Sequence, residues 1–265
     1  MEDVPPINPV SLKQSPGARS SPDPAVDLQE DIRLYAAAGV KAPLIEIAAE
    51  FEKASGRRIA LVFDTAGAVE QLFESDDGAT FLITSQTRIG NAEKTGKLTD
   101  GITETIGDTV GGFASAPGRQ KPDISTPGKL KAALLAAPRI AFSDPARGAT
   151  IGRHFLKVID ILGIRNEVLK KSRLAKDGIE TMHLILAGEA DLGVTQISEI
   201  VQANPSALVG PFPGEFDLAT TYSLWYRADV TPAAKAFARI VTGPSGRKRL
   251  QQYGLRPPDK WRNTP

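Results

Sequence analysis

The stretch FSDPARGATIGRHF, residues 142–155, places a glycine turn between an apolar run and a new amphipathic helix. The first amides of a helix have no partner within the helix and carry partial positive charge, so they bind anions. Gly148, Ala149 and Thr150 would supply such amides, together with a threonine hydroxyl. Arg147 adds a guanidinium that fits a carboxylate. The stretch therefore predicts an anion site; the alternative is an ordinary strand-to-helix loop with a surface arginine.

Three earlier apolar runs also end where a helix is predicted to begin. Their last residues share small or hydroxyl-bearing side chains and are Gly39, Thr65, Ala66, Thr84 and Ser85. Ligands of open α/β sheets bind outside the carboxyl ends of the strands, so these ends would meet at one place. None of them is acidic or basic, which predicts a neutral, polar cage around an anion.

No catalytic or metal-binding pattern accompanies these residues. The sequence has no GxSxG, HxxxH or HExxH motif, and it has no cysteine for a thiolate, disulfide or metal site. Both histidines, His154 and His183, fall on predicted helices beside apolar residues, which favours a structural role. The basic run GRKRL at 246–250 is typical of a solvated helix face. We therefore expect no metal, no cofactor and no nucleic-acid partner.

Composition agrees with a globular protein that captures its ligand locally. The chain has 265 residues, of which 41% are hydrophobic and 24% charged, and the net charge is +1. So small a net charge gives no overall attraction to nucleic acid or anionic membranes. No apolar run reaches the ~18 residues of a membrane-spanning helix. We expect a monomer.

The first 30 residues differ from the rest. They are rich in proline, serine and aspartate and lack the basic start and apolar core of a secretory signal. Residues 1–30 are predicted to form a disordered or extended tail. If the protein is exported, its signal peptide is absent from this sequence.

Strands and helices alternate after the tail, which predicts βαβ units and an α/β fold. The strands expected first are 31–39, 57–67 and 79–85, and the helices between and after them are 41–56, 68–78 and 86–98. A long strand is expected at 105–118. Further helices are expected at 126–138, 149–163, 178–190, 231–243 and 245–255, with strands at 139–144, 191–196, 207–213 and 218–229. We assign residues 31–110 and 205–265 to lobe 1, and 111–204 to lobe 2.

Two stretches resemble the periplasmic molybdate-binding protein family, the solute-binding component of an ABC importer. They are the run from IRLYAAAG to GAVEQL at 32–72 and LAGEADLGVTQISEI at 186–200, and the resemblance extends over about 31–258. It implies a two-lobed type II periplasmic binding protein fold with parallel-rich sheets and a ligand cleft between the lobes. It also implies a periplasmic location, a small anionic ligand and a membrane permease as partner.

The site residues implied by this resemblance differ from the family pattern. Gly39 stands where the family usually has serine, Thr65 and Ala66 replace a second serine, and Gln196 replaces a frequent tyrosine. The turn at 148–150 matches a helix-start contact of the family. Losing two serines and the tyrosine would enlarge the cage, which favours an organic di- or tricarboxylate over molybdate. Arg147, Thr84, Ser85 and Gln196 would suit such a ligand.

Three functions remain open from the sequence. The first is a solute receptor that closes by a hinge and then engages a permease. The second is an isomerase on the same scaffold, similar to aconitate isomerase, which needs a base beside an acidic C–H. The third is a metabolite sensor that signals to a partner protein, which no sequence feature separates from the first.

Overall fold

The computed structural model describes residues 32–257, so the predicted tail of residues 1–30 lies outside the described residues. The first elements are β1 (Ile32–Ala37), the 3-10 turn η1 (Ala38–Val40), α1 (Lys41–Ser55), β2 (Ile59–Asp64), α2 (Ala66–Glu74), β3 (Phe81–Ser85), α3 (Gln86–Lys94) and β4 (Gly101–Ser115). The middle of the chain forms α4 (Pro127–Ala136), β5 (Ile140–Ser143), η2 (Pro145–Arg147), α5 (Thr150–Ile161), α6 (Arg165–Leu169), β6 (Ser172–Ala175), α7 (Gly178–Leu186), β7 (Leu192–Gln196) and α8 (Ile197–Ala203). The last elements are η3 (Pro205–Ala207), β8 (Leu208–Pro211), η4 (Gly214–Phe216), β9 (Ala219–Arg227), α9 (Pro232–Thr242) and α10 (Pro244–Gln252).

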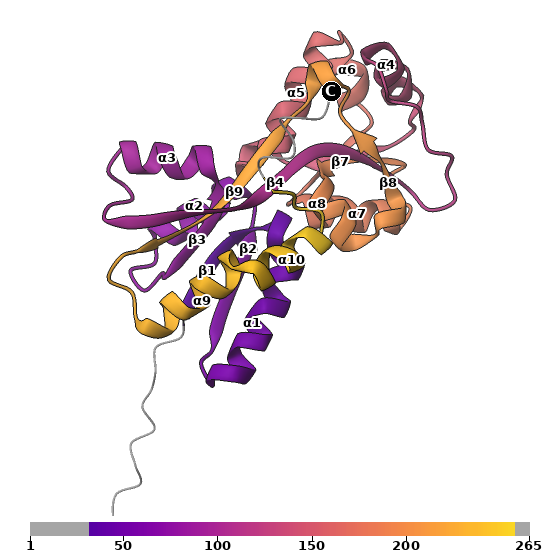
Figure 1. The fold of residues 1–265 in the computed structure, drawn as a ribbon. Helices are drawn as coiled ribbons and strands as arrows, with labels where there is room; N and C mark the ends of the chain where they lie inside the picture. The colour runs from indigo at the N-terminus through magenta and orange to yellow at the C-terminus, as the bar shows by residue number, and fades with distance from the viewer. Residues whose placement is uncertain (1–31, 258–265) are drawn as a thin grey trace, which may run out of the picture. The chain divides into compact units, whose positions relative to one another are not determined.

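Residues 32–257 form an α/β fold of two lobes that share the long strand β4 (Figure 1). The strand order is β2-β1-β3-β9-β4-β7-β5-β6, with β8 also paired to β4. We call the part around β1, β2, β3 and β9 lobe 1, and the part around β5, β6, β7 and β8 lobe 2. Pairing is parallel at β1 and β5, and antiparallel wherever β4 or β9 takes part. The fold predicted from the sequence is thus confirmed, with β4 and β9 making the sheet mixed.

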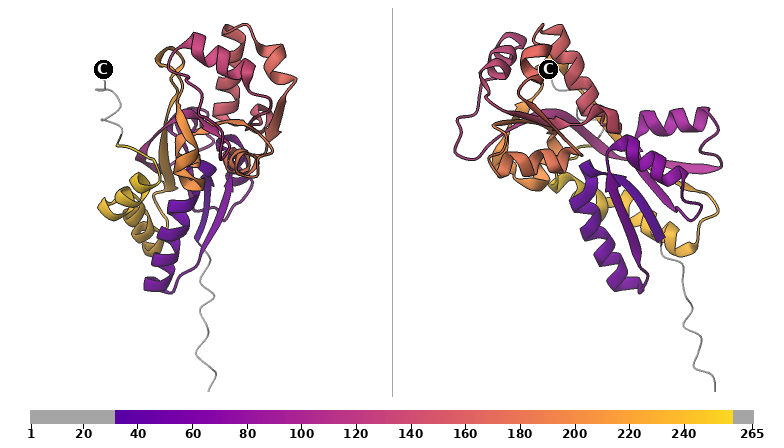
Figure 2. Two further views of the ribbon diagram at one scale, coloured as in Figure 1. Left: turned by 90° about the vertical axis from the view of Figure 1, so that its right-hand side faces the viewer. Right: turned by 180° about the vertical axis from the view of Figure 1, so that it is seen from behind.

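Each lobe has its own apolar core. In lobe 1, α1, α9 and α10 lie together on one face of the sheet (Figure 2). Phe51, Phe81 and Phe237 are buried together beneath them. The other face is covered by α2 and α3. In lobe 2, Phe113 and Phe155 pack in edge-to-face contact inside a larger cluster. The junction of the lobes lies between these two cores, and residues of both reach the cavity described below.

Local signals place several helix ends where the sequence predicts them. Thr126 and Thr231 cap α4 and α9 with their hydroxyls, each followed by proline. Gly56 ends α1 in the left-handed conformation, at φ 68°. The strand expected at 105–118 begins earlier, at Gly101, because its first residues pair with β9.

The sequence predicts that the segment around β8 belongs to lobe 1, but the structure places it with lobe 2. β8 pairs with the second half of β4, beside Phe113. Phe212 and Phe216 are buried in the core of lobe 2. Residues 205–218 therefore lie with lobe 2; the other lobe bounds stay a prediction. Among the described residues, no helix is both long and apolar enough to cross a membrane.

Candidate functional site

A small cavity lies at the lobe junction, where several helices begin. It is lined by residues at the starts of η1, α2, α5, α7 and α8, namely Ala38, Ala66, Thr150, Gly178 and Gln196. Its volume is about 30 Å³. A buried water needs a cavity of roughly 10–15 Å³, so this cavity has room for a group the size of a carboxylate.

The start of α5 is the strongest anion-binding feature of this cavity. Ala149, Thr150 and Ile151 line it, and no side chain caps the helix. Its first amides therefore lack hydrogen-bond partners among the described residues. Because these amides carry the positive end of the helix dipole, they favour a negatively charged group.

The neighbouring helix starts are already satisfied by side chains. The Asp177 carboxylate accepts a hydrogen bond from the Glu180 amide of α7 at 2.8 Å. In α8, the Thr109 hydroxyl accepts one from the Ser198 amide at 3.2 Å, and the Glu199 carboxylate accepts one from the preceding Gln196 amide at 3.1 Å. In α2, the Thr65 hydroxyl accepts from the Ala68 amide at 3.2 Å. Among these four helices of the described part of the chain, only α5 has a start with no side-chain partner, so its amides are available to a ligand.

Polar side chains complete the cavity wall. Ser143 lies at the end of β5, and its buried hydroxyl has no hydrogen-bond partner within residues 32–257. The Gln196 amide donates a hydrogen bond to the Thr220 hydroxyl of β9 at 3.1 Å. No lysine, arginine or histidine belongs to the lining residues. An anion here would depend on amides and hydroxyls.

Glu199 is an acidic residue in this cavity that the sequence analysis missed. Its side chain is buried, and burial raises its pKa to about 7. Hydrogen bonds donated by the Thr195 hydroxyl and the Gln196 amide oppose this rise, and the nearby Asp177 charge adds to it. Glu199 can therefore exchange a proton near neutral pH.

Tyr222 occupies the space beside Gly39. A Cβ atom at position 39 would lie 2.6 Å from the Tyr222 hydroxyl oxygen and 3.1 Å from the Ser198 hydroxyl oxygen. Tyr222 lines the cavity, and burial raises its pKa, with the Glu199 charge adding to the effect. Glycine at 39 is thus explained by a tyrosine from β9. The expectation that the cage is larger than in the molybdate-binding family stays a prediction.

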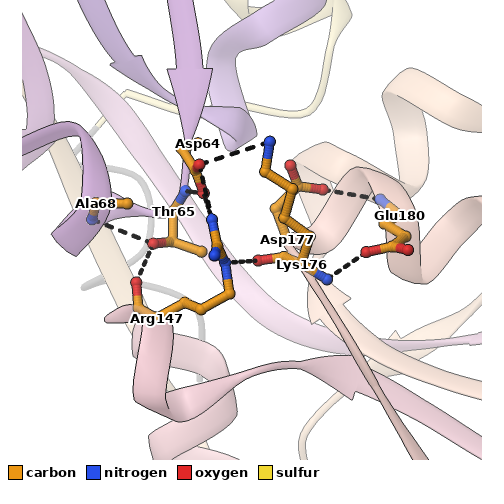
Figure 3. Close-up of polar contacts among 7 residues, drawn as sticks. All are labelled: Asp64, Thr65, Ala68, Arg147, Lys176, Asp177 and Glu180. Carbon is orange, nitrogen blue, oxygen red and sulfur yellow. Dashed lines mark hydrogen bonds and ion pairs between the residues drawn. The ribbon is translucent and has the colours of Figure 1, made fainter. Parts of the chain in front are cut away.

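Arg147 contacts Thr65, which lines the cavity, and its polar groups are bonded to other protein groups (Figure 3). Its guanidinium pairs with Asp64 of lobe 1 at 2.9 Å and donates to the Lys176 carbonyl of lobe 2 at 3.2 Å. The Lys176 ammonium lies 3.6 Å from the same Asp64 carboxylate. The Thr65 hydroxyl donates to the Arg147 carbonyl. We call these four residues the latch, because they connect the two lobes next to the cavity.

Two glycines meet beside the latch. A Cβ atom on Gly67 would lie 2.8 Å from the Gly148 Cα atom, so only glycine allows this approach of the two lobes. Gly148 also has φ 81°, in the left-handed region. The glycine predicted to admit a ligand therefore admits the opposite lobe.

The structure brings half of the predicted site residues to the cavity. Those that line it are Thr65, Ala66, Ala149, Thr150 and Gln196. Those that do not are Gly39, Thr84, Ser85, Arg147 and Gly148. Thr84 instead donates a hydrogen bond to the Ala66 carbonyl at 3.0 Å, supporting the start of α2. The ligand-binding roles of all ten stay predictions.

The other lining residues carried weaker sequence signals. Ser143 directly follows the apolar run RIAF, and Glu199 follows Gln196 at the three-residue spacing of a capping box. Asp177 stands directly before the first residue of α7, where caps occur. Thr220 and Tyr222 had no local signal, because β9 reaches the cavity through pairing with β3 and β4. Within residues 32–257, no group of three His, Cys, Asp or Glu residues is arranged to hold a metal ion.

Comparisons with known proteins agree with this architecture. A curated relative from Pseudomonas sp., named aconitate isomerase, is 25% identical over 237 residues, which cover 85% of this chain and 87% of the relative. The periplasmic molybdate-binding protein of Azotobacter vinelandii has the same fold, with a TM-score of 0.70, 19% identity and coverage of 86% of this chain and 100% of that one. Campylobacter jejuni PEB3, solved with L-phospholactate, follows at a TM-score of 0.61 and 17% identity, covering 85% and 99%. Residues 32–256 match the family described as bacterial extracellular solute-binding protein, and the chain belongs to that family.

Proposed function

We propose that this protein is an extracytoplasmic receptor that captures a small organic anion in the cavity at the start of α5. The observation that carries the proposal is the uncapped N-terminus of α5, which faces the cavity beside the unpartnered hydroxyl of Ser143. A carboxylate placed there would accept hydrogen bonds from the Thr150 and Ile151 amides and from Ser143.

The charges in the cavity favour an organic carboxylate over a doubly charged inorganic oxyanion. Asp177 and, whenever it is ionised, Glu199 are the acidic groups among the lining residues, and no basic side chain lines the cavity with them. Like charges at close range disfavour binding, and the penalty grows with the charge of the ligand. A singly charged carboxylate group therefore fits better than molybdate.

Delivery to an ABC-type permease in the periplasm is part of the proposal. The Azotobacter relative in fold is named a periplasmic molybdate-binding protein, and PEB3 was solved with an organic acid that carries a phosphate. In this protein, the latch would hold the lobes together around the ligand, and a permease would recognise the closed form.

The test compares substitutions of two buried serines, one in the cavity and one outside it, so that an effect on ligand binding can be told from an effect on folding. The Ser143 and Ser223 hydroxyls are both buried and lack hydrogen-bond partners, but only Ser143 lines the cavity. Isothermal titration of wild-type protein against mono-, di- and tricarboxylates, sulfate and molybdate would first identify a ligand. Ser143→Ala should then weaken binding by about 0.5–1.5 kcal/mol, the value of one hydrogen bond.

Ser223→Ala serves as the matched control and should leave the affinity unchanged. Neither variant should lower the free energy of unfolding much, since each removes an unsatisfied group. Tight binding of molybdate with no carboxylate binding would refute the preference for organic acids. Equal affinities of wild type and Ser143→Ala would refute the location of the site.

A second function, isomerisation of a tricarboxylic acid, is favoured by Glu199. A carboxylate with a pKa of about 7 suits a base that takes a proton from an acidic C–H and returns it to another carbon. The amides of α5 would stabilise the charge that develops on the substrate carboxylate. The curated relative named aconitate isomerase agrees with this candidate. Incubation with cis-aconitate should then yield the trans isomer with wild type and none with Glu199→Gln; saturable binding without conversion would exclude it.

A further inference from the structure

An open groove adjoins the cavity on the side of α3. Its volume is about 550 Å³, far larger than the cavity itself. Thr150 and Thr220 line both spaces, so the groove and the cavity are neighbours around these two side chains. A ligand held in the cavity has the groove as its nearest room for additional atoms.

Arg153 gives the groove a positive charge that the protein does not neutralise. Its guanidinium makes no ion pair with any described residue, and it lines the groove together with Arg88. Arg88 is itself paired with Glu70 at 2.5 Å. Arg153 is exposed at the groove; loss of solvent around its guanidinium lowers its pKa, and repulsion from Arg88 lowers it further. Both effects would be relieved by an anion between the two guanidinium groups.

The start of α3 also faces this groove without a cap. Ser85 is the N-cap residue, yet its side chain makes no capping hydrogen bond. Ser85 is only 8% exposed, lines the groove, and its hydroxyl has no partner among residues 32–257. The amides at the start of α3 and this hydroxyl can all donate to an anion.

We propose that the groove is a second anionic subsite, which binds the distal carboxylate of a short-chain organic acid whose first carboxylate lies in the cavity. Thr150 and Arg153 are three residues apart on α5, so their side chains lie on one face about one turn, ~5 Å, apart. This spacing matches an acid with two or three carbons between its carboxylates. The inference rests on the proposed function and narrows it to di- and tricarboxylates.

The test compares ligands that differ by one acidic group. Isothermal titration of the full chain with butyrate, succinate and tricarballylate should give affinities for the two polyacids at least ~10-fold above that for butyrate, because charge-assisted hydrogen bonds are among the strongest. Arg153→Gln should weaken polyacid binding about 10-fold and leave butyrate binding unchanged. Arg153→Lys should recover part of the loss, since it keeps the charge but not the planar fork.

Lys157→Gln is the matched control, because Lys157 lies on the same helix, carries the same charge, is exposed and lines neither space. Equal loss of affinity in Lys157→Gln and Arg153→Gln would show a general field effect and overturn the subsite. Equal affinities for butyrate and succinate, both unchanged by Arg153→Gln, would also overturn it and leave the proposed function intact. Failure of all the anions to bind would overturn both.

Discussion

Replacing Glu199 by glutamine tests whether burial in the cavity keeps this carboxyl neutral. The pKa of Glu199 is about 7 in the folded protein, against an ordinary value of 4.5. At a pH between these two pKa values, the Glu199 carboxyl has lost its proton in the unfolded chain but keeps it in the folded protein. The free energy of unfolding therefore falls as pH rises from about 4.5 to about 7, and Glu199 causes no further change above that.

The size of the effect follows from the gap between the two pKa values. At about 1.4 kcal/mol per pKa unit, the gap is worth on the order of 3 kcal/mol. Glutamine keeps the shape of the side chain and an oxygen that accepts from the Gln196 amide, but it does not ionise. Relative to wild type, Glu199→Gln should thus gain about 3 kcal/mol in unfolding free energy between pH 4.5 and pH 8.

Urea unfolding followed by circular dichroism at several pH values measures this difference directly. Other titrating groups are common to both proteins, so they cancel in the comparison. Glu167→Gln is a suitable control, because Glu167 is exposed on α6 and its charge stays solvated. A difference between Glu199→Gln and wild type that stays constant from pH 4.5 to pH 8 would refute the assignment of a neutral, buried carboxyl.

Two further substitutions test the packing around the cavity. Gly39→Ala should cost about 1–3 kcal/mol of stability through the 2.6 Å approach to the Tyr222 hydroxyl, and adding Tyr222→Phe should recover part of it in urea unfolding, because the ring keeps a carbon atom 3.0 Å from the new Cβ atom. No recovery would mean that the Tyr222 hydroxyl is not the obstacle. Arg147→Gln should cost about 1 kcal/mol or less, because its side chain is 41% exposed, but it should speed ligand release in stopped-flow experiments by opening the latch. An unchanged release rate would mean that the latch does not hold the lobes closed around the ligand.

Much of the fold was predictable because its signals are local. The capping threonines 126 and 231 and the left-handed Gly56 mark helix ends within a few residues of sequence. By contrast, α6 has five residues, and β6 lies at the sheet edge with Leu174 52% exposed, so neither shows a clear apolar period. Short and edge elements form through tertiary contacts rather than through their own sequence pattern.

The site was predictable to the extent that it is built from helix starts. Ala149 and Thr150 were identified because a strand, a turn and a helix follow one another directly. The partner of Arg147 was not, since Asp64 is 83 residues away in sequence. Tyr222 likewise reaches Gly39 only through the sheet. Local sequence thus indicates which groups are able to bind an anion. Long-range contacts decide which of these groups already have a partner within the protein.

The amide signals of Thr150 and Ile151 offer the most direct measurement of the central claim, that an anion binds at the start of α5. In a titration with succinate followed by nitrogen–proton correlation NMR, both signals should shift downfield and saturate together, because their N–H groups gain an anionic acceptor. The amides at the start of α9, which Thr231 caps away from the cavity, should stay unchanged. Saturable succinate binding that leaves the Thr150 and Ile151 signals in place would contradict the account.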